Sequence, residues 1–195
     1  MQNKEQTYNY LNTFAKYVIQ QSRSNLSKQG KSFEKKLYNS LDSEIEVSAN
    51  SFRLAFLMED YGKFVDKGVR GKDPSKVSPN AKIKGQQAPQ SEYKFGSGNF
   101  SGTWGNFTGK LEKWVKSKNL RLRDSKGRFT QGNVKTIAQI VARNIYARGI
   151  KPSLFFTKPF EKAFERLPDE LVEAYSLDVE QFLQYTINKK WKKYL

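Results

Sequence analysis

The hydrophobic period changes within the first sixty residues, and this change constrains the fold more than any other feature of the chain. From Thr7 to Leu26 the apolar residues recur at three- and four-residue steps, which predicts a helix with one buried face. In the run SEIEVSANSFRLAFLMED, residues 43–60, apolar and polar residues alternate, which predicts two strands. Because only the turn-prone ANS separates them, an antiparallel hairpin is the simplest arrangement.

Helical periodicity returns in the second half of the chain. It predicts a short helix around Leu111 to Val115, a helix over 134–148 that ends at Gly149, another after Thr157, and a last one over 169–188. The predicted fold class is therefore α+β, with an N-terminal helix, a small antiparallel β-sheet with a long inserted loop, and C-terminal helices that cover the sheet. We expect one domain over residues 1–167, followed by an added helix and a basic tail over 168–195.

Residues 69–108 predict the long loop. The segment is rich in glycine and proline and has no apolar period, yet it is also rich in aromatic residues, unlike a solvated linker. We expect it to stay extended until a neighbouring subunit orders it by burying these aromatic side chains. The predicted subunit-interface residues are Phe95, Phe100, Trp104 and Phe107.

The positive charge is concentrated in the middle of the chain. The net charge is +16, and residues 70–128 carry 14 basic and 4 acidic side chains. This imbalance predicts contact with DNA or with an acidic partner, and since no sequence-reading motif is present, DNA contact would be to the backbone. The predicted contact residues are Lys72, Lys76, Lys82, Lys84, Arg121, Arg123, Lys126 and Arg128.

The composition restricts the chemistry that the chain can perform. Neither cysteine nor histidine occurs, which excludes Cys–His and Ser–His–Asp catalysis as well as ordinary zinc sites. Glu59, Asp60 and Asp66 could form a carboxylate metal site, but lysines interleave with them and no ordered ligand series is present. We therefore expect no enzyme activity, no metal and no cofactor. With no signal-like segment and no apolar run of about 18 residues, we expect a soluble, cytosolic chain without membrane contact.

Two short motifs follow in order along the chain. The first is Y-x-x-F-V-D-x-G, represented by Tyr61, Phe64, Val65, Asp66 and Gly68, and it comes after an L-x-x-S-L run over residues 37–41. The second is P-x-x-F-F-x-x-P-F, represented by Pro152, Phe155, Phe156, Pro159 and Phe160. Both could simply pack, the first over the sheet and the second in the core.

Their order resembles the bacteriophage neck and tail-completion proteins, the head–tail joining subunits that include minor tail protein Z-like chains. The resemblance covers residues 8–167, and it implies a virion structural protein that is not an enzyme. It also implies a ring of identical subunits around the DNA channel, between portal-side and tail-side proteins, assembled in the host cytoplasm. The long loop after Gly68 and the helix after Pro168 are additions to the family pattern.

Two other hypotheses remain open at the level of sequence. The chain could be a free, nonspecific nucleic-acid-binding protein, whose aromatic side chains would stack on bases. It could also be a metal-dependent nuclease built on Glu59, Asp60 and Asp66, which would require divalent-metal-dependent cleavage.

Overall fold

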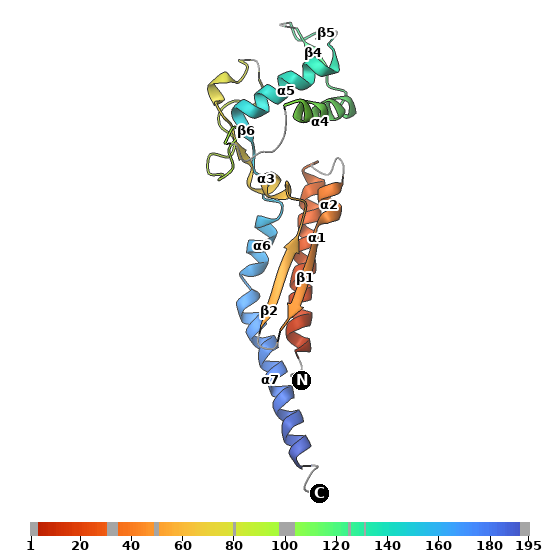
Figure 1. Cartoon of the computed structure of the whole chain (residues 1–195), viewed down its shortest axis with the longest axis vertical. Coiled ribbons are helices and arrows are strands. Elements are labelled where there is room, and N and C mark those ends of the chain that lie inside the picture. Colours follow the sequence, from red (N-terminus) through yellow and green to blue (C-terminus); the bar gives the residue numbers. More distant parts are fainter. Residues whose placement is uncertain are drawn as a thin grey trace. The chain divides into compact units, whose positions relative to one another are not determined.

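The chain has an α+β fold, as predicted (Figure 1). The structure is a computed structural model, and it describes residues 4–30, 35–48, 51–79, 81–97, 104–124, 126–130 and 132–191. It divides into two compact units, which are described separately. Unit 1 combines residues 1–62 with 154–195, and unit 2 comprises residues 63–153. This division differs from the predicted boundary at residue 167, because both ends of the chain contribute to the same unit.

Unit 1 is built on the long N-terminal helix α1 (Glu5–Lys28) and the β-hairpin. Helix α1 buries Leu11, Phe14, Val18 and Leu26, which is the predicted apolar stripe. The predicted hairpin is confirmed: β1 (Asp42–Val47) pairs antiparallel with β2 (Phe52–Leu57). Helix α2 (Lys36–Ser40) leads into β1, and α6 (Thr157–Phe164) and α7 (Leu167–Trp191) complete the unit along α1.

Aromatic rings form the centre of unit 1. Phe56 of β2 makes edge contacts with Phe14 of α1 and with Phe156 and Phe160 at α6, at ring-centroid distances of 5.2–6.3 Å. Such edge-to-face pairs add about 0.5–1.5 kcal/mol each beyond the area that they bury. The hairpin is therefore held between the N-terminal helix and the C-terminal helices of the same unit.

Helix α7 holds the first turn of α1. The Asp178 carboxylate, only 4% exposed, accepts hydrogen bonds from the backbone N–H groups of Gln6 and Thr7 at 3.0 and 2.9 Å. It also accepts one from the Thr7 hydroxyl at 2.6 Å. A helix start leaves such N–H groups without partners, and Lys4, at the N-cap, supplies no side-chain cap. Asp178 therefore performs the capping role from a distant part of the chain.

Tyr10 provides a second polar link between α1 and α7, and its titration can be tested. Its hydroxyl donates a hydrogen bond to the Glu170 carboxylate. Burial raises the pKa of Tyr10 to about 12, and the bond to Glu170 and the charge of Glu170 add to the shift. Because the folded state favours the protonated form, this contribution to stability is present below pH ~10 and is lost as the pH rises towards 12. In a tyrosinate absorbance titration, Tyr10→Phe should remove a late-titrating component and Glu170→Gln should shift it to lower pH. Because the pKa of Tyr93 is also raised, some late absorbance can remain in Tyr10→Phe, but a late component of undiminished amplitude would contradict this assignment.

Unit 2 is a pair of packed helices preceded by a folded connection. Helix α4 (Trp104–Ser117) packs against α5 (Val134–Arg148) around Val115, Ile137 and Ala138. In the sequence, a small hairpin of β4 (Leu122–Arg123) and β5 (Phe129–Thr130) connects α4 to α5. Strand β3 (Val69–Arg70), which follows α3 (Gly62–Lys67), pairs antiparallel with β6 (Gly149–Ile150), directly after α5.

The expectation that residues 69–108 remain extended until a neighbour orders them is wrong for the part of the segment that the structure describes. The backbone N–H of Lys72 donates to the Tyr146 carbonyl at 2.9 Å, and that of Gln87 donates to the Arg148 carbonyl at 2.7 Å. Pro74–Lys76 form a short 3-10 helix, η1. Helix α4 begins at Trp104, inside the segment that was expected to be a loop. The segment lacks a period because these hydrogen bonds run to α5 and β6 and form no regular element of their own.

Candidate nucleic-acid or acidic-partner interface

Nearly all of the net charge belongs to unit 2. Residues 63–153 carry 20 basic and 5 acidic side chains, whereas the remainder carries 15 basic and 14 acidic ones. Unit 2 therefore has a net charge of +15 and unit 1 a net charge of +1. A potential of this size attracts polyanions and acidic protein surfaces over a range of about one Debye length, ~8–10 Å.

The structure separates the eight predicted contact residues into two groups at opposite ends of α5. The first group, Lys72, Lys76, Lys82 and Lys84, belongs to the segment that is hydrogen-bonded to the C-terminal end of α5. The second group, Arg121, Arg123, Lys126 and Arg128, lies on and beside the β4–β5 hairpin that precedes α5. Since α5 has 15 residues, the two groups are separated by about 20 Å.

In the first group, the cations lie among aromatic and acidic neighbours. The ammonium of Lys72 lies 5.9 Å from the ring centroid of Tyr146, and that of Lys76 lies 3.6 Å from an Asp73 carboxylate oxygen. A hydrogen bond from Ser75 is the main cause that lowers the pKa of Asp73. Nearby, burial lowers the pKa of Arg148, whose Nε, like that of Arg70, is buried and has no hydrogen-bond partner among the described residues.

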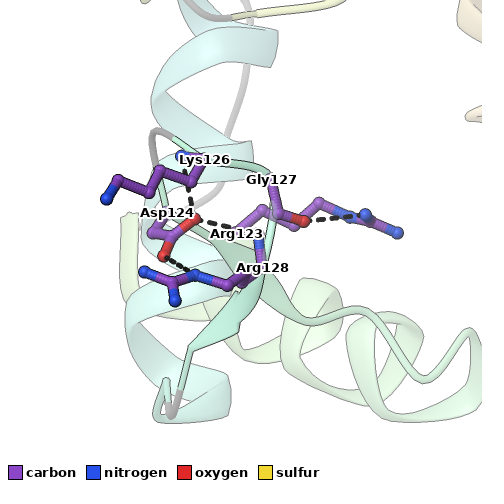
Figure 2. Close-up of polar contacts among 5 residues, drawn as sticks. All are labelled: Arg123, Asp124, Lys126, Gly127 and Arg128. Atoms are coloured by element: carbon purple, nitrogen blue, oxygen red, sulfur yellow. Dashed lines mark hydrogen bonds and ion pairs between the residues drawn. The ribbon is translucent and has the colours of Figure 1, made fainter.

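In the second group, Asp124 organises the turn (Figure 2). Its carboxylate accepts hydrogen bonds from the backbone N–H groups of Lys126 and Arg128 at 2.9 and 2.8 Å, and from Arg128 Nε at 3.2 Å. Arg123 Nη1 donates to the Gly127 carbonyl at 2.9 Å. In the view of Figure 2 the guanidinium groups of Arg123 and Arg128 leave the turn on opposite sides.

Three of the four predicted interface aromatics pack together within unit 2. Phe95, Trp104 and Phe107 surround Tyr146, and the rings of Phe95 and Trp104 lie 5.4 and 5.9 Å from it. Trp104 nevertheless remains 44% exposed. Phe100, the fourth, lies outside the described residues. A contact between this cluster and a neighbouring subunit stays a prediction.

The two sequence motifs meet in space, although they are about ninety residues apart. The Ser153 hydroxyl donates a hydrogen bond to the Val65 carbonyl at 2.7 Å. The Ser153 backbone N–H donates to the carbonyls of both Val65 and Asp66. Gly68 has a φ of +72°, and a Cβ there would lie 2.5 Å from the Ile150 carbonyl oxygen and 2.7 Å from Pro152 N. Glycine is therefore required at position 68 by the close approach of the backbone at residues 150–152.

The other motif residues pack within their own units. Phe155 is fully buried, Pro159 is buried, and Phe156 and Phe160 belong to the aromatic centre of unit 1. The ring of Phe64 contacts that of Tyr93 in unit 2, with 4.7 Å between their centroids. Tyr61 is 41% exposed, and Asp66 is buried.

The described residues contain no cluster of metal-ligating side chains. Within them, no three His, Cys, Asp or Glu side chains gather as a metal site would require, and Glu59, Asp60 and Asp66 form no such group. An open groove of about 570 Å³ lies along α1, but its Arg23 donates to the Tyr38 and Leu41 carbonyls and so holds the α2–β1 connection. None of the helices in the described part of the chain is long and apolar enough to span a bilayer.

Sequence reasoning missed two features of this surface. Phe129, on the hairpin, is 61% exposed and lies beneath two arginines, and Asp124 orders the turn. The run RDSKGRF contained the signal, because an aspartate two to four residues before a glycine and a basic residue is typical of a side-chain-ordered turn. Comparison with known proteins adds no further assignment: no family model, no curated protein and no solved structure matches the chain.

Proposed function

We propose that this chain is a structural subunit of the bacteriophage neck, which forms a ring with other copies of itself around the DNA channel between portal-side and tail-side proteins. The observation that carries the proposal is the segregation of charge, with +15 on unit 2 and +1 on unit 1. A ring subunit needs one cationic part that tolerates a polyanion and other surfaces that contact protein. The hydrogen bonds from Ser153 to Val65 and Asp66, which join the segments of the two sequence motifs, support the same proposal.

Helix α7 supplies a surface suited to contact with a second copy. Val172, Tyr175, Val179 and Leu183 recur at three- and four-residue steps, and they are 37–66% exposed. The opposite stripe of the helix, which includes Ala174 and Asp178, is the one buried in unit 1. An apolar stripe of this length on a free helix costs hydration free energy unless a partner covers it.

Charge complementarity favours unit 2 of a neighbouring copy as the partner that covers this stripe. Residues 167–188 carry five acidic and no basic side chains. In unit 2, Lys72 and the half-exposed Trp104 lie beside the Phe95–Tyr146 ring cluster, so that surface is both basic and aromatic. A contact between two different surfaces of identical chains is heterologous, and such a contact forms a ring when the rotation from one copy to the next closes.

Substitutions on α7 test this contact. Val172→Asp with Val179→Asp places two charges in the apolar stripe, and we expect it to raise the concentration needed for self-association at least tenfold in sedimentation velocity. Leu177→Asp is the matched control, since Leu177 is 46% exposed on the same helix but lies off the stripe. A further variant, Glu173→Lys, should weaken association, and Lys72→Glu should partly restore it. Equal effects of the control and the stripe variant would contradict the assignment of the seam.

The neck assignment itself is tested with virion partners. The purified chain should bind portal-side or tail-side components, and electron microscopy of the particle should find it in a ring at the neck. Because a ring subunit can remain monomeric alone, the partner assay is the decisive measurement. A chain that neither self-associates at high concentration nor binds these components would overturn the proposal.

One observation favours the second candidate, a free nonspecific nucleic-acid-binding protein: the exposed Phe129 lies among arginines. In that case single-stranded DNA should quench the exposed tryptophan Trp104 and bind without assembly. In the neck assignment Trp104 fluorescence should respond to association between copies.

A further inference from the structure

The cations of the β4–β5 hairpin all face outward. Leu122 packs towards Val115 and Ile137 in the centre of unit 2, which fixes the hairpin to α4 and α5. Since successive side chains of a strand alternate between its faces, Arg121 and Arg123 lie on the opposite face from Leu122. Phe129 pairs with Arg123 across the hairpin and is 61% exposed. Residues 116–128 carry six basic side chains and one acidic side chain.

The chain's own contacts hold these cations in place before any ligand binds. Asp124 orders the turn through three hydrogen bonds, and Arg123 is held by the Gly127 carbonyl. Ordering a free arginine side chain on binding costs conformational entropy, and a preordered hairpin avoids part of that cost. Arg128 uses only Nε in its bond to Asp124, and its side chain remains 72% exposed.

Phe129 distinguishes a phosphate ligand from a base ligand. The guanidinium carbon of Arg123 lies 4.2 Å from the ring centroid and that of Arg121 lies 5.9 Å from it. A base that stacked on the ring face covered by Arg123 would have to displace a cation that the ring attracts. The ring therefore supports arginines that contact phosphate, and this favours duplex DNA, whose bases are already stacked.

We infer that the β4–β5 hairpin binds the phosphate backbone of double-stranded DNA without reading its sequence, through Arg121, Arg123 and Arg128, with Phe129 as a positioning residue. This inference rests on the proposed function and deepens it by naming the partner of one group of cations. The other group of cations, around Lys72, is assigned to the proposed contact between copies.

Salt dependence of binding tests the phosphate contacts. Binding of the full chain to a short mixed-sequence duplex is measured by fluorescence anisotropy over a range of salt concentrations. Each phosphate contact contributes about 0.9 to the slope of log affinity against log salt. Arg121→Gln with Arg123→Gln and Arg128→Gln should therefore reduce the slope by about 3 and weaken binding on the order of 100-fold at ~0.1 M salt.

The matched control removes the same charge elsewhere. Lys158, Lys162 and Arg166 are exposed on and just after α6 in unit 1, and their triple Gln variant changes the net charge equally. It should leave the slope unchanged and weaken binding less than threefold. Circular dichroism melting of both variants checks that the fold survives. Equal losses in the two variants would mean general charge attraction and would overturn the inference.

Substitutions of Phe129 separate positioning from base stacking. Phe129→Leu should weaken duplex binding about two- to fivefold through loss of the cation–π contact, and Phe129→Tyr should retain it. Tighter binding of the same sequence as a single strand, with a larger loss in Phe129→Leu, would overturn the duplex assignment in favour of stacking. Absence of duplex binding at low salt would also overturn it.

The outcomes separate this inference from the proposed function. If the hairpin variant loses duplex binding but still joins portal-side or tail-side components, both stand. If the chain binds duplex DNA through the hairpin but joins no virion component, the neck assignment falls and the duplex contact remains. If it joins the components and the hairpin variant binds DNA as the unmodified chain does, the duplex contact alone falls.

Discussion

Replacing Gly149 with alanine is expected to lower the free energy of unfolding of unit 2 by about 3–4 kcal/mol. Gly149 has φ +93° and ψ −171°, a backbone region that costs other residues about 1–3 kcal/mol. A Cβ there would also lie 2.2 Å from the Val69 carbonyl oxygen and 2.6 Å from Gly71 N. Those atoms are backbone atoms of the β3–β6 contact, so they cannot rotate away, and overpacking adds about 1–3 kcal/mol.

Gly127→Ala is the control for this prediction. Gly127 also has a positive φ, +80°, but nothing lies within 4 Å of the position that a Cβ would occupy. Gly127→Ala should therefore lower the free energy of unfolding only by the backbone strain, about 1–2 kcal/mol. Native-state hydrogen exchange reports the two units separately, and amides of α5 should lose protection in Gly149→Ala while those of α1 keep it. Equal losses for the two glycines would show that the close approach to Val69 is unimportant.

Replacing Asp178 with alanine is expected to destabilise unit 1 by about 3 kcal/mol. The substitution leaves the N–H groups of Gln6 and Thr7 and the buried Thr7 hydroxyl without their acceptor. Loss of a helix cap costs about 0.5–2 kcal/mol, and a buried donor without a partner costs about 1–3 kcal/mol. The carboxylate also interacts favourably with the positive end of the α1 dipole, which alanine cannot do.

Two comparisons sharpen the Asp178 experiment. Asp178→Asn keeps one oxygen acceptor but no charge, so its loss should fall between those of the unmodified chain and Asp178→Ala. Glu173→Ala removes an exposed carboxylate from the same helix and should change stability by less than about 0.5 kcal/mol. Urea unfolding followed by circular dichroism, at concentrations below self-association, measures all three. An Asp178→Ala protein as stable as Glu173→Ala would show that α7 does not cap α1 in solution.

Features that depend on neighbours in sequence were predictable. The α1 stripe, the β1–β2 hairpin and the helices α5 and α7 follow from hydrophobic periods, because each buries one face along its length. The concentration of cations in the middle of the chain was also predictable. Its division into two groups was not, since it depends on which segment is hydrogen-bonded to which end of α5.

Residues 69–97 show where prediction from the chain alone reached its limit. Their composition matched that of an extended arm, yet their described backbone donates and accepts hydrogen bonds with residues 146–150, more than fifty positions away. No local period records such pairing, because each bond joins single residues in irregular backbone. The position of Asp178 beneath the first turn of α1 escaped for the same reason.

Local patterns in the amino acids were enough to specify the secondary structure, the fold class and the excess of positive charge, because amphipathic periods and composition are properties of contiguous segments. Long-range contacts set the division into two units, the folded state of the glycine-rich segment, the meeting of the two motifs and the capping of α1 by Asp178. The physical reason is that these features depend on free energies of contact between residues distant in the chain, such as Val65 with Ser153.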